Sequence, residues 1–145
     1  MNRTKLSPAN IVILAAGVVM LIASFMAFYR LPFPGGTVTA NAWDRGLFLI
    51  ATLPVLLGGF MALQVGLVAF GRIDMPNRLL GLSWDQVHLV LALQCVVLML
   101  AFWAESRPPT VTFGAGFWLM FAAAIALVVG ALMRIATTRR RPRAI

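Results

Sequence analysis

The chain has 145 residues, of which 61% are hydrophobic and only 11% are charged. A soluble domain of this length usually has about a quarter of its residues charged, so the composition excludes an ordinary soluble domain. The apolar residues fall into four blocks, each long enough to cross a hydrocarbon layer of about 30 Å. The sequence therefore predicts an all-α membrane protein whose single domain, 1–145, is a bundle of four transmembrane helices.

The predicted elements alternate between these apolar blocks and short polar segments. The first connection is the longest, and it contains two prolines and two adjacent glycines. In chain order we expect a helix at 9–28, an outer loop at 29–46, a helix at 47–70, a cytoplasmic loop at 71–85, a helix at 86–104, an outer loop at 105–112, a helix at 113–133 and a basic tail at 134–145.

The net charge of +8 does not indicate nucleic-acid binding, because the basic residues gather beside the apolar blocks. With four spans, both tails and the middle connection lie on one side of the membrane. They hold nine Lys and Arg residues (two in the first tail, two in the middle connection and five in the last tail), whereas the outer loops hold three. The positive-inside rule then predicts both termini in the cytoplasm. The preference for arginine over lysine suggests a bacterial protein, so we expect a multi-pass protein of the bacterial plasma membrane.

Two Trp-Asp pairs precede predicted helices, Trp43-Asp44 before the second and Trp84-Asp85 before the third. Tryptophan is enriched at membrane interfaces, and aspartate is a good N-cap. We therefore expect each pair to be an interfacial anchor followed by a helix cap. The same interfacial role is expected of Trp103 and Trp118. Pro54, inside the second predicted helix, is expected to bend it.

Small residues recur every four positions in two of the predicted helices, which allows close helix–helix approach. The two tracks are Gly58, Ala62 and Gly66 in the second helix, and Ala122, Ala126 and Gly130 in the fourth. Gln64 and Gln94 are the polar residues deepest in the hydrocarbon. We expect them to form an interhelical hydrogen bond, with the lining of a substrate path as the alternative.

No residue pattern indicates catalysis or a metal site. All four acidic residues lie at predicted helix ends or in loops, so we expect a protein that is not an enzyme and has no cofactor. His88 is the only histidine. A haem or metal ligand, or a proton relay, is the alternative to a structural role, but one histidine supplies only one of the two axial ligands that a haem in a membrane bundle usually has. A basic cluster follows the last helix and is expected to contact lipid headgroups: Arg139, Arg140, Arg141 and Arg143.

A resemblance to a known group rests on the first half of the chain. A cluster of aromatic residues ends the first helix, and a Gly/Thr-rich outer loop closes on Asn41-Ala42-Trp43-Asp44. This pattern resembles small four-helix membrane proteins common in actinobacteria, whose activity is uncharacterised. The resemblance implies a topology but no function.

The function expected from these features is that of a non-enzymatic accessory or structural subunit of a cell-envelope complex, or of a small homo-oligomer. Its partners would be membrane lipids and other membrane subunits or copies of itself, and the outer loop 29–46 would be its recognition surface. One alternative is a carrier or channel for a lipid or apolar small molecule. Another is a haem- or quinone-associated redox subunit that uses His88.

Overall fold

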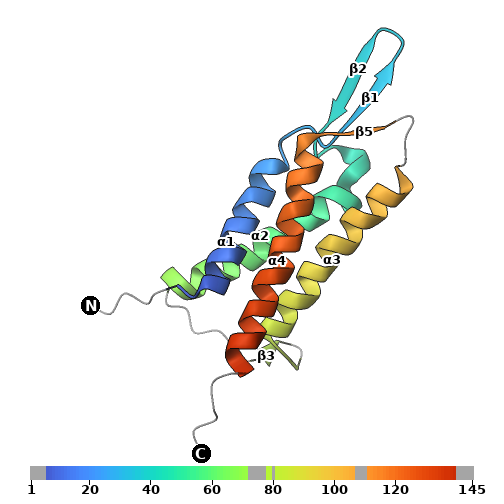
Figure 1. Cartoon of the computed structure of the whole chain (residues 1–145). Coiled ribbons are helices and arrows are strands. Elements are labelled where there is room, and N and C mark those ends of the chain that lie inside the picture. Colours follow the sequence, from blue (N-terminus) through green and yellow to red (C-terminus); the bar gives the residue numbers. More distant parts are fainter. Residues whose placement is uncertain (1–5, 72–77, 80, 107–110, 140–145) are drawn as a thin grey trace, which may run out of the picture.

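The structure, a computed structural model, describes residues 6–71, 78–79, 81–106 and 111–139. Four α-helices pack side by side in a bundle (Figure 1). They are α1 (Pro8–Ala23), α2 (Leu53–Phe70), α3 (Trp84–Glu105) and α4 (Ala115–Arg139). Three helical segments, Leu49–Phe70, Trp84–Glu105 and Ala115–Arg139, are long and apolar enough to cross a membrane, and α1 is apolar but shorter. The predicted bundle of four apolar helices is confirmed, and its composition indicates a membrane protein.

The first helix ends earlier than expected, at Ala23 rather than at residue 28. The reason lies in the partners of the next backbone groups. The Ser24 carbonyl accepts a hydrogen bond from the Ala42 N–H (3.0 Å), and the Ala27 carbonyl accepts one from the Gly116 N–H (3.0 Å). These bonds to distant segments replace the intrahelical bonds that a longer α1 would need.

The second helix begins later than expected. Residues 45–52 form a 3-10 turn, η1 (Arg45–Leu47), and a π-helical turn, η2 (Phe48–Thr52), before α2 begins. Pro54 lies in the first turn of α2, directly after the π-helical turn and within a helical segment that runs from Leu49 to Phe70. The proline thus lies where the π-helical turn changes to regular α-helix, and the bend predicted at this position stays a prediction.

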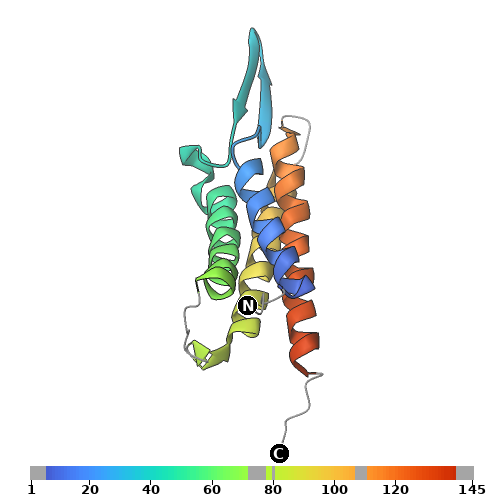
Figure 2. The ribbon, with the colours of Figure 1, turned by 90° about the vertical axis from the view of Figure 1, so that its left-hand side faces the viewer.

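The helices form a ring in which α1 packs between α2 and α4, and α3 packs against the same two helices. Figures 1 and 2 show this arrangement from two sides. The centre of the bundle is filled mostly by unbranched and aromatic side chains. The largest fully buried ones include Met20, Met61, Met99, Met120, Phe28, Phe117 and Leu127.

The first small-residue track faces α1. A Cβ atom added to Gly58 would lie 2.7 Å from Met20 Sδ, and one added to Gly17 would lie 2.5 Å from the Cβ of Ala62. Such distances are too short for carbon and sulfur atoms, so α1 and α2 can pack this closely only because these positions lack side chains.

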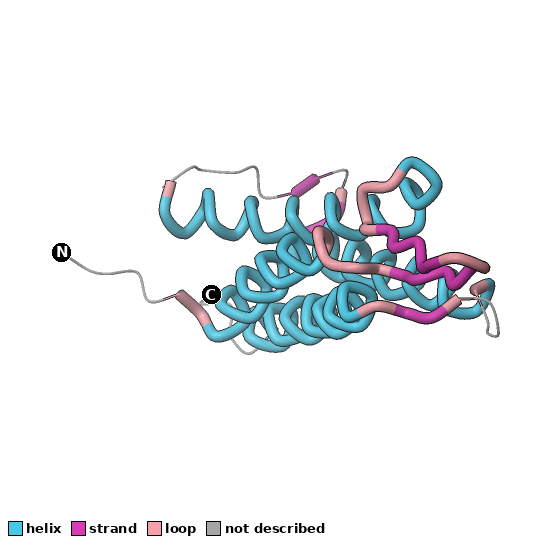
Figure 3. Tube along the Cα trace, turned by 90° about the horizontal axis from the view of Figure 1, so that it is seen from above, coloured by secondary structure: helices cyan, strands magenta, loops and turns pink. Residues whose placement is uncertain are grey.

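The structure also contains strands, which an all-α fold does not predict. A three-stranded antiparallel sheet extends one end of the bundle, with strand order β2-β1-β5. Its strands are β1 (Tyr29–Phe33), β2 (Gly36–Ala40) and β5 (Thr112–Phe113), and they run next to one another in the view from above (Figure 3). A second, two-stranded pair, β3 (Arg78–Leu79) with β4 (Leu82–Ser83), lies at the opposite end, below α3 (Figure 1).

Candidate functional site

The expected outer loop 29–46 is mainly a β-hairpin that projects beyond the helices (Figure 2). Strands β1 and β2 pair from Tyr29↔Ala40 to Phe33↔Gly36, which leaves Pro34 and Gly35 as the turn. Proline fixes the second position of the turn near φ −65°, and Gly35 has φ 110° at the third. A positive φ at the third position is what a type II turn requires, and glycine adopts it without steric cost.

The hairpin has two different faces, because side chains alternate along each strand. Tyr29, Leu31, Phe33, Val38 and Ala40 share one face according to the strand register. At the base of this face Ala40 is buried, and at its tip Phe33 and Val38 are 51% and 52% exposed. The apolar face is thus covered near the bundle and uncovered at its outer end.

The opposite face carries the hairpin's polar side chains. Arg30, Pro32, Thr37 and Thr39 occupy it, and all four are exposed. Arg30 makes no ion pair with any residue that the structure describes. The hairpin therefore presents an apolar surface and a basic, hydroxyl-bearing surface on its two sides.

The motif Asn41-Ala42-Trp43-Asp44 forms the base of the hairpin. The Asp44 carboxylate accepts a hydrogen bond from the Asn41 N–H (2.7 Å), and the Asn41 side chain accepts one from the Trp43 N–H (2.8 Å). Trp43 Nε1 donates to Ser24 Oγ (2.9 Å). Asp44 therefore stabilises this turn and is not the predicted N-cap of the second helix, since α2 begins only at Leu53.

A second connection holds the hairpin from the side of α4. The Gly114 N–H donates to the Phe28 carbonyl (2.9 Å), and β5 pairs with β1 at Tyr29 and Arg30. A Cβ atom on Gly114 would overlap the backbone of Ala27. The sequence analysis missed this contact, although the Gly-Ala-Gly at the start of the fourth helix was a visible signal.

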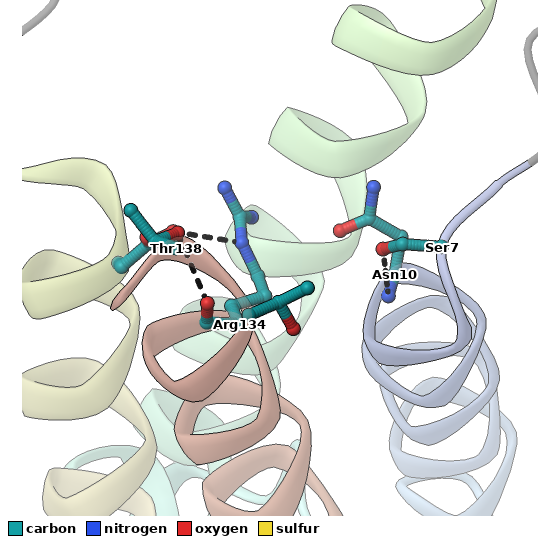
Figure 4. Close-up of a pocket in the computed structure, with 6 residues that line it drawn as sticks. Ser7, Asn10, Arg134 and Thr138 are labelled. Atoms are coloured by element: carbon teal, nitrogen blue, oxygen red, sulfur yellow. Dashed lines mark hydrogen bonds and ion pairs between the residues drawn. The ribbon is translucent and has the colours of Figure 1, made fainter. Parts of the chain in front are cut away.

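At the opposite end of the bundle, a polar cluster joins α3 to α4. Arg134 Nε lies 2.9 Å from Asp85 Oδ1, and the two side chains are 21% and 17% exposed. The Thr138 hydroxyl lies 2.9 Å from Asp85 Oδ2 and 3.0 Å from the Arg134 carbonyl. An open pocket of about 370 Å³ borders this cluster. Figure 4 shows Ser7, the N-cap residue of α1, and Asn10 of α1 across that pocket from Arg134 and Thr138 of α4.

His88 lies behind this cluster and is 0% exposed. Its Nδ1 is 3.0 Å from an Nη atom of Arg134. Because arginine only donates, Nδ1 is the acceptor and a neutral ring carries its proton on Nε2. Nε2 is buried and has no hydrogen-bond partner within the structure. The ring is thus enclosed, and its Nδ1 is occupied by Arg134.

Asp85 does not cap the third helix, because Ser83 does. The Ser83 hydroxyl accepts from the Gln86 N–H (3.4 Å), and the Gln86 side chain accepts from the Ser83 N–H (2.9 Å). This reciprocal capping box places Asp85 within the first turn of α3, from which it reaches Arg134. Ser-x-x-Gln before an apolar block is a readable signature that the Trp-Asp pair obscured.

The two glutamines expected to pair differ in burial. Gln64 of α2 is buried, whereas Gln94 of α3 is exposed. The remaining residues of the two small-residue tracks differ in burial. Gly66 is half-buried beside Leu14, Gly130 is buried against Ile13, Ala126 is half-buried and Ala122 is exposed.

The predicted interfacial tryptophans differ in burial. Trp43, Trp103 and Trp118 are exposed, and Trp84 is half-buried beside the His88 ring. Of the predicted basic cluster, Arg139 is exposed at the end of α4. Arg140, Arg141 and Arg143 lie outside the described residues.

Within the described parts of the chain, no group of three or more His, Cys, Asp or Glu side chains is arranged to hold a metal ion. No family model, curated protein or solved structure matches the chain.

Proposed function

We propose that this chain is a non-enzymatic accessory subunit of a cell-envelope membrane complex, and that it recognises its partner through the hairpin Tyr29–Ala40. The observation that carries the proposal is the exposed apolar tip, Phe33 and Val38, on a hairpin that projects beyond the bundle. Large apolar side chains are rarely grouped on a water-exposed surface, and exposed apolar patches commonly mark interaction sites.

The anchoring of the hairpin supports this role. A recognition element binds more tightly when its shape exists before the partner arrives, because less conformational entropy is then lost. Here the base is held by Asn41, Trp43 and Asp44 on one side and by β5 on the other. The tip is therefore presented in a defined orientation.

The proposed topology has four spans, with both termini in the cytoplasm and the hairpin outside. The start of α1, the end of α4 and the β3–β4 pair lie at one end of the bundle, opposite the hairpin (Figure 1). Nine basic residues belong to the tails and the middle connection and three to the other loops, which favours the end of the bundle opposite the hairpin as the cytoplasmic one.

The two alternatives have weaker support. A carrier path would need Gln64 and Gln94 to line the same cavity. Gln64 is buried in the bundle, whereas Gln94 is exposed on its outside, which does not favour a shared path. A haem ligated by His88 does not suit an enclosed ring that already binds Arg134.

The test uses the photocrosslinker benzoylphenylalanine in place of Phe33, in the native membrane. We expect one adduct of defined mass, and no equivalent adduct from the crosslinker at Phe70, an exposed aromatic residue at the other end of the bundle. A second comparison places the same residue on the two hairpin faces. Val38→Asn should reduce the adduct strongly, whereas Thr39→Asn should not. Equal adducts from these two variants, or none from Phe33, would contradict the proposal.

A further inference from the structure

The outer edge of the hairpin is an uncovered sheet edge. In the order β2-β1-β5, strand β2 has β1 on one side and no strand that the structure describes on the other. An edge strand presents unpaired N–H and C=O groups in a row and is a template for another strand.

The register identifies which groups point outward. In an antiparallel pair of strands, residues opposite each other alternate between hydrogen-bonded and non-hydrogen-bonded pairs. Phe33 and Gly36 close the two-residue turn and therefore form a hydrogen-bonded pair, so the next pair, Pro32↔Thr37, is a non-hydrogen-bonded one. The missing N–H of Pro32 agrees with this assignment. Two residues further on, Arg30↔Thr39 is again a non-bonded pair. Thr37 and Thr39 thus direct their backbone N–H and C=O groups to the open edge.

This edge lacks the usual protection. Natural sheets block exposed edges with charged residues, prolines or bulges. Strand β2 is Gly-Thr-Val-Thr-Ala, with no charge and no proline, and Thr and Val favour strands. Its pairing with β1 is continuous over all five residues, without a bulge. The sequence of β2 therefore suits the addition of a strand.

We infer that β2 binds an extended segment of a different protein as a fourth strand of the sheet, an inference that rests on the proposed function of the hairpin. The two faces specify the chemistry of that segment. Its residues beside Val38 would be apolar, extending the surface of Phe33. The alternate residues, on the side of Thr37 and Thr39, would be polar, and an acidic one would complement the exposed Arg30, which has no ion pair with a described residue.

A second copy of this chain does not suit the edge. The hairpin continues the direction of the helices (Figures 1 and 2), so antiparallel pairing of two β2 strands would invert one bundle in the membrane. Copies with the same orientation, related by a twofold axis along the strands, would bring N–H groups opposite N–H groups. The partner strand therefore belongs to another chain on the hairpin side of the membrane.

The test removes one outward N–H at a time and keeps β1 pairing intact. Thr39→Pro deletes the edge N–H, whereas Thr39→Ala loses the same hydroxyl and keeps that N–H; Thr37→Pro and Thr37→Ala form a second matched pair. With the crosslinker at Phe33, each proline variant should lower the adduct yield about tenfold or more, the loss expected for a hydrogen bond with its strand contact. The alanine variants should stay within about twofold of the parent protein.

Hairpin integrity is checked by amide exchange at Val38, whose N–H faces β1 and should stay protected in the proline variants. If a proline disturbs it, replacement of Thr39 by its α-hydroxy acid removes the same N–H without the ring. If the variants that lack an edge N–H and the alanine variants give equal adduct yields while the Val38 amide stays protected from exchange, strand addition is overturned. The proposed recognition role of the hairpin would then still stand. Absence of any adduct from the parent protein would overturn both.

Discussion

Asp85 and Arg134 are the only ion pair between described residues, and they join the first turn of α3 to the later turns of α4. Both side chains are mostly buried, and both have further hydrogen bonds, to Thr138 and to His88. Removal of one charge would leave the other poorly solvated, which costs more than the loss of an exposed pair. The pair therefore joins α3 to α4 at the end of the bundle opposite the hairpin.

We predict that Asp85→Asn lowers the free energy of unfolding by about 1 to 3 kcal/mol, between the values for exposed and fully buried pairs. Reversible unfolding of the protein in detergent measures the change. Thr137→Ala is the control, because among the described residues its hydroxyl bonds only to the Met133 carbonyl, and it should change stability by less than about 0.5 kcal/mol. An Asp85→Asn variant as stable as the control would show that the pair contributes no net stability.

Trp43 supplies the second residue-level prediction. Trp43→Phe keeps an aromatic ring to stack on Phe25, 5.8 Å away between centroids, but loses the N–H bond to the buried Ser24 hydroxyl. We expect a loss of about 0.5 to 1.5 kcal/mol in the free energy of unfolding. Trp103→Phe, at an exposed position of α3, is the matched control and should cost less. If the two substitutions cost the same, the Ser24 bond is not what anchors the motif.

Residue-level roles were only partly predictable from the sequence. Trp43-Asp44 is local, and its importance was visible, but the role of Asp44 as a turn residue rather than a helix cap depends on where α2 begins. Arg134 could be counted only as a topological charge, since its partners Asp85 and His88 lie 49 and 46 residues away in the chain. A single sequence carries no pattern that pairs such residues.

At the level of elements, the ends of α1 and α4 meet through backbone groups. The first N–H groups and last C=O groups of a helix lack partners within that helix. Here the N–H groups of Gly114 and Gly116, at the start of α4, donate to carbonyls that follow α1. The start of α4 thus finds hydrogen-bond acceptors in the segment that follows α1, and glycine lets the backbones approach.

Gly114→Ala should therefore destabilise the protein strongly, because its Cβ would overlap the Ala27 carbonyl. We expect a loss of about 3 kcal/mol, the upper range for overpacking, seen as a lower thermal midpoint. Gly59→Ala makes the same chemical change inside α2, where no atom lies within 4 Å of the added Cβ, and should be neutral or stabilising by up to about 1 kcal/mol. A thermal midpoint for Gly114→Ala equal to that for Gly59→Ala would contradict the close contact.

The hairpin was more predictable than the sequence analysis allowed. Tyr29, Leu31 and Phe33 alternate with Arg30 and Pro32, and a Pro-Gly turn separates them from a Thr-Val-Thr run, which is a hairpin signal. Two prolines and two glycines made an irregular loop the simpler expectation. Strand β5 was not predictable, since its two residues become a strand only by pairing with β1.

At the scale of the molecule, the outside of the bundle carries many large apolar side chains. Examples on the four helices are Ile22, Leu63, Val90 and Val129, as expected where lipid is the solvent. Helix α1, at 16 residues, spans only about 24 Å, and the chain that follows it continues into the hairpin. The bundle of apolar helices could be predicted from the composition, because long apolar blocks in lipid have few other stable arrangements.

The proposed topology can be tested with single introduced cysteines, because the native Cys95 is buried and should not react. We predict that Val38→Cys, at the hairpin tip, reacts with a membrane-impermeant maleimide added to intact cells. Thr137→Cys, exposed near the end of α4, should react only after the membrane is opened, since the nine-to-three excess of basic residues favours a cytoplasmic location for that end. The unsubstituted protein controls for Cys95. Labelling of Thr137→Cys but not Val38→Cys in intact cells would reverse the orientation, and labelling of both would contradict a bundle that crosses the membrane.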